Sequence, residues 1–219
     1  MAAPPELIYG RRPVAEAERG KRQVRRVWRA PETPAEELAR LAGSSDHQGV
    51  VAEVDPYPYA DPGQLLAEPG RLLVALDQVQ DPRNLGAVCR SAEVAGAGGL
   101  VIPERRSAAV TAAACKASAG AVEHLAVARV RNLADWLAQA REDGYWAWGA
   151  EAEGATAYTD ADLSGGTILV LGGEGKGLRP RVAAACDGLL AIPRRGRTDS
   201  LNVSAAAAVL LFEAVRQRD

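Results

Sequence analysis

The sequence predicts an α/β protein built on a parallel sheet, and two observations carry the prediction. From Arg71 onward, short apolar runs alternate with helical patterns, and continuous apolar strands are typical of a parallel sheet covered on both faces. The second observation concerns residues 77–90, 169–178 and 194–204, where apolar runs give way abruptly to Gly, Pro, Asn or Asp. Ligands of open α/β sheets bind at loops of this kind, where parallel strands end.

Residues 1–54 are predicted to form a small α/β unit that precedes this sheet. Its expected elements are helices at Pro13–Arg19 and Pro34–Ala42 and strands at Gln23–Trp28 and Gly49–Val54. Residues 55–70 carry four prolines, and proline neither continues a helix nor pairs fully in a sheet. The sequence therefore predicts a linker over 55–70 and a second domain over 71–219.

Strands and helices alternate in the second domain. The expected strands are Leu72–Leu76, Gly99–Ile102, Leu125–Val130, Tyr145–Ala150, Thr167–Leu171 and Gly188–Ile192. The expected helices are Leu85–Ala95, Ala108–Ala117, Leu133–Glu142, Pro180–Ala185 and Asn202–Arg216. Pro180 fits the preference for proline in a first helical turn. The last helix is nearly all Ala, Val and Leu from Ala205 to Val215, so it is predicted to be buried.

Composition excludes several classes of protein. With 47% hydrophobic and 25% charged residues, the chain can bury a globular core. No apolar run reaches the length of about 18 residues that a membrane span needs, and the first thirty residues show no signal peptide. Cys89, Cys115 and Cys186 are far apart and form no Cys-x-x-Cys pair, so neither a zinc site nor a disulfide framework is expected. A reducing cytoplasm fits this cysteine usage best.

Positive charge is concentrated near the N-terminus, although the net charge is only −2. From Arg11 to Arg29, eight basic and two acidic residues give a local charge of +6. Such a segment indicates a polyanionic partner such as a nucleic acid. A solvated helix face with snorkelling side chains is the alternative.

The glycine-rich run at 172–177 does not match two common phosphate-binding motifs. Lys176 is followed by Gly177 rather than by Ser or Thr, as a phosphate loop requires. The Gly-x-Gly-x-Gly spacing also differs from the dinucleotide fingerprint, and no acid ends a suitably placed strand. Neither His47 nor His124 completes a Ser/His/Asp set.

The segment from Arg194 to Ser204 is the most informative of the three strand-to-helix loops. It places Ser200, Asn202 and Ser204 at the start of an apolar helix. The first turn of a helix presents unbonded backbone N–H groups, and these side chains add oxygens at the same point. Such a point binds a small polar ligand, or the side chains cap the helix.

Together the three loops resemble the three motifs of the SpoU family, also called the TrmH family, of RNA ribose 2′-O-methyltransferases. The matching segments are Asn84-Leu85-Gly86 through Arg90 to Ser91-Ala92, then Leu171 to Leu178, then Ile192-Pro193 through Ser200 to Ser204. Their order and spacing are intact over residues 71–219. Residues 1–54 also resemble the small substrate-binding domain of the ribosomal-RNA branch, at Ile8-Tyr9-Gly10 and His47 to Ala52, but are shorter between Leu41 and His47.

The resemblance implies a parallel-sheet catalytic domain with a C-terminal trefoil knot, S-adenosylmethionine as cofactor and a homodimer. It implies methyl transfer to a ribose 2′-hydroxyl, with a guanosine of 23S ribosomal RNA as the favoured target. A transfer-RNA enzyme and an antibiotic-resistance ribosomal-RNA enzyme are alternatives. A non-catalytic RNA-binding module that retains the fold is the alternative from another class. The expected setting is the cytoplasm, with no membrane, DNA or metal.

Residue by residue, the resemblance places Arg90 beside the 2′-hydroxyl and the neighbouring phosphate. Because a guanidinium stays protonated, stabilising the emerging alkoxide suits Arg90 better than acting as a base. The other catalytic candidates are Asn84, Glu174, Ser200 and Asn202. The expected cofactor-binding residues are Leu171, Gly172, Gly173, Gly175, Gly177, Ile192, Leu201, Asn202 and Ser204. The expected RNA-binding residues are Arg11, Arg12, Arg22, Arg25, Arg194 and Arg195.

Each catalytic candidate also has a purely structural alternative. Asn84, Ser200 and Asn202 suit helix capping. Arg90 suits a surface ion pair on its helix, and Glu174 suits an exposed loop.

Overall fold

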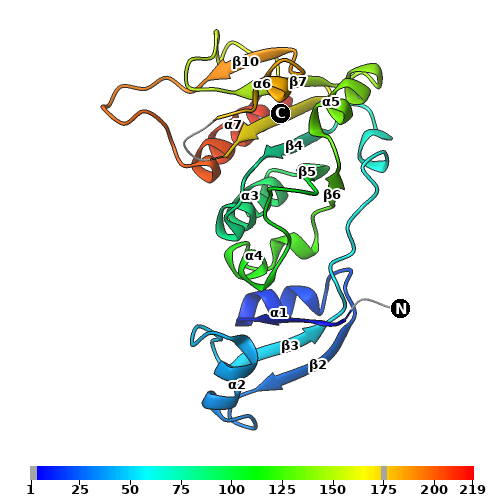
Figure 1. The fold of residues 1–219 in the computed structure, drawn as a ribbon, viewed down its shortest axis with the longest axis vertical. Coiled ribbons are helices and arrows are strands. Elements are labelled where there is room, and N and C mark those ends of the chain that lie inside the picture. The colour runs from blue at the N-terminus through cyan, green and yellow to red at the C-terminus, as the bar shows by residue number, and fades with distance from the viewer. Residues whose placement is uncertain (1–3, 174–176) are drawn as a thin grey trace.

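Two sheets organise residues 4–173 and 177–219, which the computed structural model describes. The smaller sheet is antiparallel, with β1 (Glu6–Tyr9), β3 (Val50–Val54) and β2 (Val24–Arg29) in that order. The larger sheet has seven parallel strands in the order β6-β5-β4-β9-β7-β10-β8. Figure 1 shows the two sheets at opposite ends of an elongated molecule.

The smaller sheet with α1 (Arg11–Ala17) and α2 (Ala35–Ala42) is here called the front unit. Its core is formed where Ile8 of β1 and Val14 of α1 pack with Ala52 of β3. Strand β1 was not predicted, because four residues with a single fully buried side chain carry little pattern. Its pairing with β3, more than forty residues later in the chain, stabilises it.

The larger sheet and its helices are here called the sheet unit. Its strands are β4 (Leu72–Asp77), β5 (Gly99–Pro103), β6 (Val127–Val130), β7 (Trp146–Ala150), β8 (Thr156–Ala157), β9 (Thr167–Gly172) and β10 (Gly188–Ala191). Its α-helices are α3 (Pro82–Val94), α4 (Ala112–Ala117), α5 (Leu133–Glu142), α6 (Pro180–Ala183) and α7 (Val203–Arg218), with short 3₁₀ turns at Gln64–Leu66 and Ala121–Glu123. All six predicted strands and all five predicted helices of this unit are present. The two-residue edge strand β8 was not predicted.

Two helix starts differ from the prediction for local reasons. Helix α3 begins at Pro82 rather than Leu85, because the carboxylate of Asp81 accepts a 2.8 Å hydrogen bond from the backbone N–H of Arg83 and caps the helix. Helix α4 begins four residues later than predicted. The backbone N–H of Ala108 donates to the carbonyl of Val79 at 2.8 Å, which holds the preceding segment in a loop against the β4–α3 connection.

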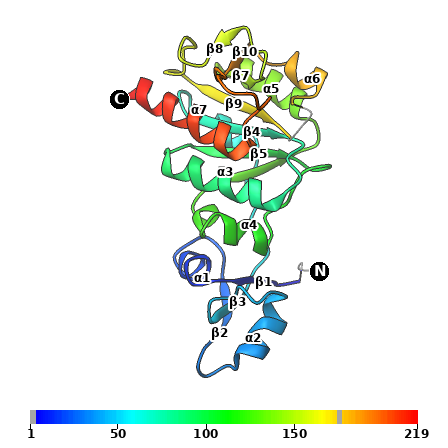
Figure 2. The same ribbon diagram turned by 90° about the vertical axis from the view of Figure 1, so that its left-hand side faces the viewer.

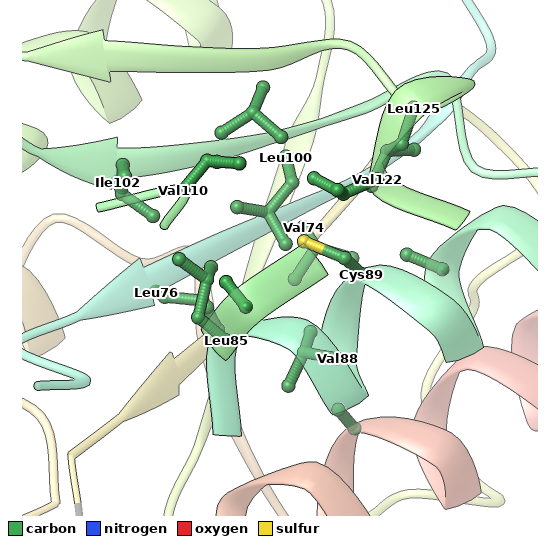
Figure 3. Close-up of a cluster of buried hydrophobic side chains, with 14 of the residues drawn as sticks. Val74, Leu76, Leu85, Val88, Cys89, Leu100, Ile102, Val110, Val122 and Leu125 are labelled. Atoms are coloured by element: carbon green, nitrogen blue, oxygen red, sulfur yellow. The ribbon is translucent and has the colours of Figure 1, made fainter. Parts of the chain in front are cut away.

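Both faces of the larger sheet are covered, as continuous apolar strands predicted. Alternate residues of β4 enter different cores: Val74 and Leu76 pack on the side of α3, and Leu73 and Ala75 on the side of α5. Figure 3 shows the first of these cores, with Val88 and other α3 side chains beneath the strands. The carboxyl ends of β4 and β9 therefore lie together at one edge of a rigid sheet.

Helix α7 is only half buried, which corrects the prediction for Ala205 to Val215. Leu210 and Leu211 are buried where the helix packs on α3 and β9, but Phe212 exposes 48% of its surface and Val209 36%. An apolar composition predicts that a helix packs against other apolar surface, but it does not show whether that surface belongs to the same chain. Among the described helices, none is long and apolar enough to cross a membrane.

Residues 55–70 lie along the sheet unit and are anchored to it at several points. The Tyr57 hydroxyl donates to the carbonyls of Val122 (3.0 Å) and Leu125 (2.8 Å). The backbone N–H of Ala60 donates to the carbonyl of Val127 at 2.8 Å. These contacts restrict how the front unit moves relative to the sheet unit.

Candidate functional site

The first and third polar loops meet at the carboxyl edge of the larger sheet. The side-chain amide of Asn202 donates a 3.1 Å hydrogen bond to the side-chain oxygen of Asn84, across 118 residues of sequence. Asn84 lies in the first turn of α3 and Asn202 directly precedes α7. Both helices run in the same direction, side by side, in Figure 2. The contact therefore joins two loops that the sequence had singled out separately.

Asn202 acts as a helix cap and as a link between loops at the same time. Its side-chain oxygen accepts from the backbone N–H of Ser204 at 2.8 Å and from the Ser204 hydroxyl at 2.6 Å, while its amide group donates to Asn84. An asparagine side chain has a separate acceptor and donor, so the two roles do not compete. The capping alternative for Asn84 was wrong, because Asp81 caps α3.

Arg90 is exposed on α3, one and a half turns beyond Asn84. Its neighbours Val88 and Cys89 point into the core (Figure 3), which leaves Arg90 on the outer face of the helix. Among the described residues Arg90 forms no ion pair, so the surface ion-pair alternative does not apply. Arg83, two helical turns earlier on the same face, is also exposed and was not predicted as a site residue.

A buried ion pair that the prediction missed holds the second loop against the first. The carboxylate of Asp77 has no exposed surface, and it accepts from the backbone N–H and the Nε of Arg179, both at 2.8 Å. The backbone carbonyl of Asp77 also accepts from Gly173 at 2.8 Å. A buried carboxylate needs such partners. The sequence did offer a sign of this ion pair, because Asp77 is an acidic residue at the end of an otherwise apolar strand.

The glycines of the second loop are required by the chain's own packing. A Cβ on Gly172 would lie 2.1 Å from the carbonyl carbon of Gly177, and one on Gly173 would lie 2.5 Å from the carbonyl oxygen of Gln78. Close approach of backbone to backbone therefore explains these glycines, where the sequence had suggested close approach of a ligand. The predicted roles of Glu174 and Gly175 fall outside the described residues.

Glu151, which follows β7, supports the end of the same loop. Its carboxylate accepts a 2.6 Å hydrogen bond from the backbone N–H of Leu178. The prediction did not include Glu151, although an acid directly after a strand at the carboxyl edge was a usable signal. Asp77 and Glu151 thus orient the backbone of the second loop from two neighbouring strands.

The third loop combines apolar and polar side chains at its surface. Leu201 exposes 51% of its surface beside Asn202, and Ile192 is half-buried. Ser200 and Arg195 are exposed, while Arg194 pairs with Glu153 at 2.5 Å. Apolar walls next to a few fixed polar groups are typical of small-ligand sites. The predicted residues of this loop therefore suit an aromatic or apolar part of a ligand together with its hydroxyl or amino groups.

The cysteine next to Arg90 is a poor nucleophile. Burial raises the pKa of the Cys89 thiol to about 12, so the nucleophilic thiolate is scarce at neutral pH. Within residues 4–173 and 177–219, no group of three or more His, Cys, Asp or Glu side chains is placed to hold a metal ion.

Comparison with known proteins assigns the fold and its loops to a family. The model of the SpoU rRNA methylase family matches residues 71–212, which include all three loops. This chain belongs to the SpoU family. A Mycolicibacterium vanbaalenii protein named as an uncharacterized tRNA/rRNA methyltransferase is 46% identical over 192 residues, or 85% of this chain and 61% of its own length. The chain spans between 61% and 63% of the length of three such curated relatives.

Solved structures of the SpoU family agree with the fold to different extents. The SpoU methyltransferase AviRb from Streptomyces viridochromogenes, crystallised with AdoMet, is 29% identical and gives a TM-score of 0.82 over 98% of this chain and 90% of AviRb. A TrmH/SpoU tRNA-modifying enzyme from A. aeolicus is 26% identical and gives 0.61 over 72% of this chain and 82% of the enzyme. The second match thus leaves out more than a quarter of this SpoU-family chain.

The arginines predicted to bind RNA in this SpoU-family chain differ in accessibility. Arg11 and Arg12 are exposed, and Arg25 is exposed but paired with Asp55 at 2.5 Å. Arg22 is a wrong prediction, because only 4% of its surface is exposed. Its Nε donates to Glu123 at 2.9 Å and its Nη1 to Glu6 at 3.2 Å. Within a run of basic residues, the sequence does not distinguish the arginine that turns inward.

Proposed function

We propose that this chain is an S-adenosylmethionine-dependent methyltransferase that acts on a ribose 2′-hydroxyl of RNA. The observation that carries the proposal is the hydrogen bond between Asn84 and Asn202. It brings the first and third SpoU motifs together at the edge of the sheet where α/β proteins bind ligands. Arg90 is exposed on α3, the helix whose first turn contains Asn84.

The cofactor fits the residues around the second and third loops. S-adenosylmethionine supplies the methyl group as a sulfonium when bound. Leu201 and Ile192 offer apolar surface for its adenine, and Ser204 and the backbone around Leu171, Gly172, Gly173 and Gly177 offer polar contacts. The AdoMet complex of AviRb, a structure with the same fold, supports this assignment.

Arg90 is proposed to bind the RNA phosphate next to the target ribose and to stabilise the 2′-oxygen as it loses its proton. A guanidinium donates two parallel hydrogen bonds to phosphate oxygens and stays charged throughout. A fixed positive charge near a developing alkoxide lowers the barrier to transfer. Asn84 and Asn202 are proposed to orient the surrounding loops, and the exposed Ser200 to contact the RNA or the cofactor.

A guanosine of 23S ribosomal RNA is the proposed target. Two comparisons favour this choice over transfer RNA, since the matching family model is that of the SpoU rRNA methylases and the tRNA-modifying enzyme of the family matches only 72% of this chain. Exposed Arg105 and Arg106, on the loop that is hydrogen-bonded to Val79, add positive charge beside the site. Such charges bind the RNA backbone without reading its sequence.

A second copy of the chain is proposed to cover the exposed face of α7. Val209 and Phe212 lie three residues apart on α7, and so on one side of the helix. Both are exposed, at 36% and 48%, and exposed apolar side chains that adjoin one another mark an association surface. Light scattering should give twice the mass of the chain, and a monomer at micromolar concentration would contradict the homodimer. The trefoil knot stays a prediction.

Methyl transfer from tritiated S-adenosylmethionine to unmodified 23S ribosomal RNA, and separately to unmodified transfer RNA, tests the proposed substrate. We expect label in the ribosomal RNA alone. Label in transfer RNA alone would overturn the choice of substrate but not of activity. Cofactor binding without label in either RNA or in pre-ribosomal particles would favour a non-catalytic RNA-binding module.

A further inference from the structure

A cleft of about 450 Å³ lies where the front unit meets the sheet unit. Arg11, Arg12 and Gln48 line it from the front unit, and Lys116 lines it from α4 of the sheet unit. Pro13 and Ala119 complete the lining. We call this space the junction cleft. It is composite, because each unit alone supplies only part of its lining.

Positive charge predominates in the junction cleft, and hydrogen bonds hold two of the side chains that carry it, Lys116 and Arg11. The Nζ of Lys116 donates to the carbonyl of Asp46 at 2.8 Å and lies 5.6 Å from the centre of the Tyr9 ring. The Nε of Arg11 donates to the carbonyl of Gln48 at 3.2 Å. Three cations border the cleft, and the paired Asp46 carboxylate, 3.3 Å from Lys116, offsets one of them.

The two walls of the junction cleft are fixed relative to each other by buried polar contacts. Arg22 of the front unit donates from Nε to Glu123 of the sheet unit at 2.9 Å, and both side chains are only 1% exposed. Nearby, His124 lies 2.9 Å from Glu16 of α1. A site whose walls are already in place loses little entropy when a ligand binds.

We propose that the junction cleft binds phosphate groups of the RNA backbone, at a distance from the nucleotide that is methylated. This inference rests on the proposed function, since it gives the RNA substrate a second contact. Arginine and lysine side chains that line an open cleft supply the donors that phosphodiester oxygens accept from. Helix α4 also packs on α3, which carries Arg90, so the cleft is fixed relative to the reaction site. An RNA that contacts both the junction cleft and Arg90 is therefore bound in a single register.

The test measures the affinity of unmodified 23S ribosomal RNA transcripts for the protein at salt concentrations between about 50 and 200 mM. Each phosphate contact that is lost lowers the slope of log K against log salt by about 0.9. We expect Lys116→Gln to reduce the slope by about one contact and to raise the RNA KM several-fold, with kcat and cofactor affinity unchanged. Lys116→Arg should retain the slope. Arg40→Gln is the matched control, since Arg40 is an exposed cation of the front unit that lies outside both the cleft and the basic segment.

The outcomes separate this inference from the proposed function. Wild-type protein that binds S-adenosylmethionine but neither binds nor methylates RNA would overturn the proposed function. Wild-type protein that methylates RNA, with Lys116→Gln giving the same slope and KM as Arg40→Gln, would overturn only the role of the junction cleft. Inhibition of Lys116→Gln and wild type to the same degree by inorganic pyrophosphate would also count against a phosphate site there.

Discussion

Asn84 and Arg90 illustrate how residues on one helix reach different partners. The Asp81 cap starts α3 early enough that Asn84 lies inside the first turn, facing Asn202, while Arg90 is exposed on the outer face. The helix therefore presents an amide to the third loop and a guanidinium to solvent. In the proposed reaction, the first contact positions the loops and the second meets the RNA.

At the residue scale, Arg90→Ala should lower kcat for methyl transfer by roughly 10²–10³-fold, the usual cost of removing one donor to a developing oxyanion. The cofactor Kd should stay unchanged, because Arg90 is not among the residues proposed to bind it. Single-turnover transfer to RNA and calorimetry of cofactor binding measure the two quantities. Arg83→Ala is the matched control on the same face of α3. A kcat in Arg90→Ala equal to that of the control would refute the catalytic role.

At the element scale, α7 shows what an apolar sequence pattern predicts about a helix and what it does not. The apolar sequence after Asn202 predicted the length and position of this helix. It did not predict the exposed side that carries Phe212, because composition alone does not identify the partner that covers a helix. Strands β1 and β8 escaped prediction for a related reason. Both are short edge strands that depend on pairing with distant residues. Helices and strands that carry a periodic apolar pattern, a capping residue or a proline in the first turn could be predicted from the sequence.

The end of α7 also carries a group whose titration affects stability. Side-chain hydrogen bonds from Arg216 and Gln217 hold the pKa of Glu213 to about 2, below its usual 4.5. Gln217 in turn accepts from the backbone N–H of Leu163 at 2.8 Å, which ties the helix to a surface loop. Because the folded-state pKa is lowered, the ionised carboxylate stabilises the fold above about pH 4.5.

That stabilisation should therefore be lost as the pH falls from about 4.5 towards 2. Denaturant unfolding of wild type and Glu213→Gln at a series of pH values measures the difference in free energy of unfolding between them. We expect the difference to be constant above about pH 5 and to shrink towards zero near pH 2. A difference independent of pH over this range would show that the carboxylate charge contributes nothing.

At the scale of the whole molecule, the buried pair of Arg22 and Glu123 joins the two units. The same pair shows that a basic segment of sequence does not reveal which of its arginines are buried. Arg11, Arg12 and Arg25, which are proposed to contact RNA, are exposed, whereas Arg22, in the same run, is buried against a residue 101 positions away. The order of the motifs predicted the family and the loops of the site. The Arg22–Glu123 contact could not be predicted in this way, because it depends on how the two units pack together.

Arg22→Met should lower the melting temperature by roughly 10 °C. Breaking a buried pair by removing one partner costs about 3–5 kcal/mol, and each kcal/mol shifts Tm by about 2–4 °C at this chain length. Arg22→Met/Glu123→Met, which leaves no unpaired buried charge, should recover most of the loss. Arg19→Met, which removes a surface pair with Glu16, is the control and should shift Tm by little. Calorimetric Tm values for Arg22→Met and Arg19→Met that agree would mean that the buried pair does not join the units.

The proposed methyl transfer takes place at a ribose oxygen. Nucleoside mass spectrometry of RNA treated with the protein and S-adenosylmethionine tests this most directly, with Arg90→Ala treated in parallel. We predict a 2′-O-methylated guanosine in RNA treated with the wild type and only a trace in RNA treated with the variant. A nucleoside methylated on its base, or equal amounts of product from both proteins, would contradict the account.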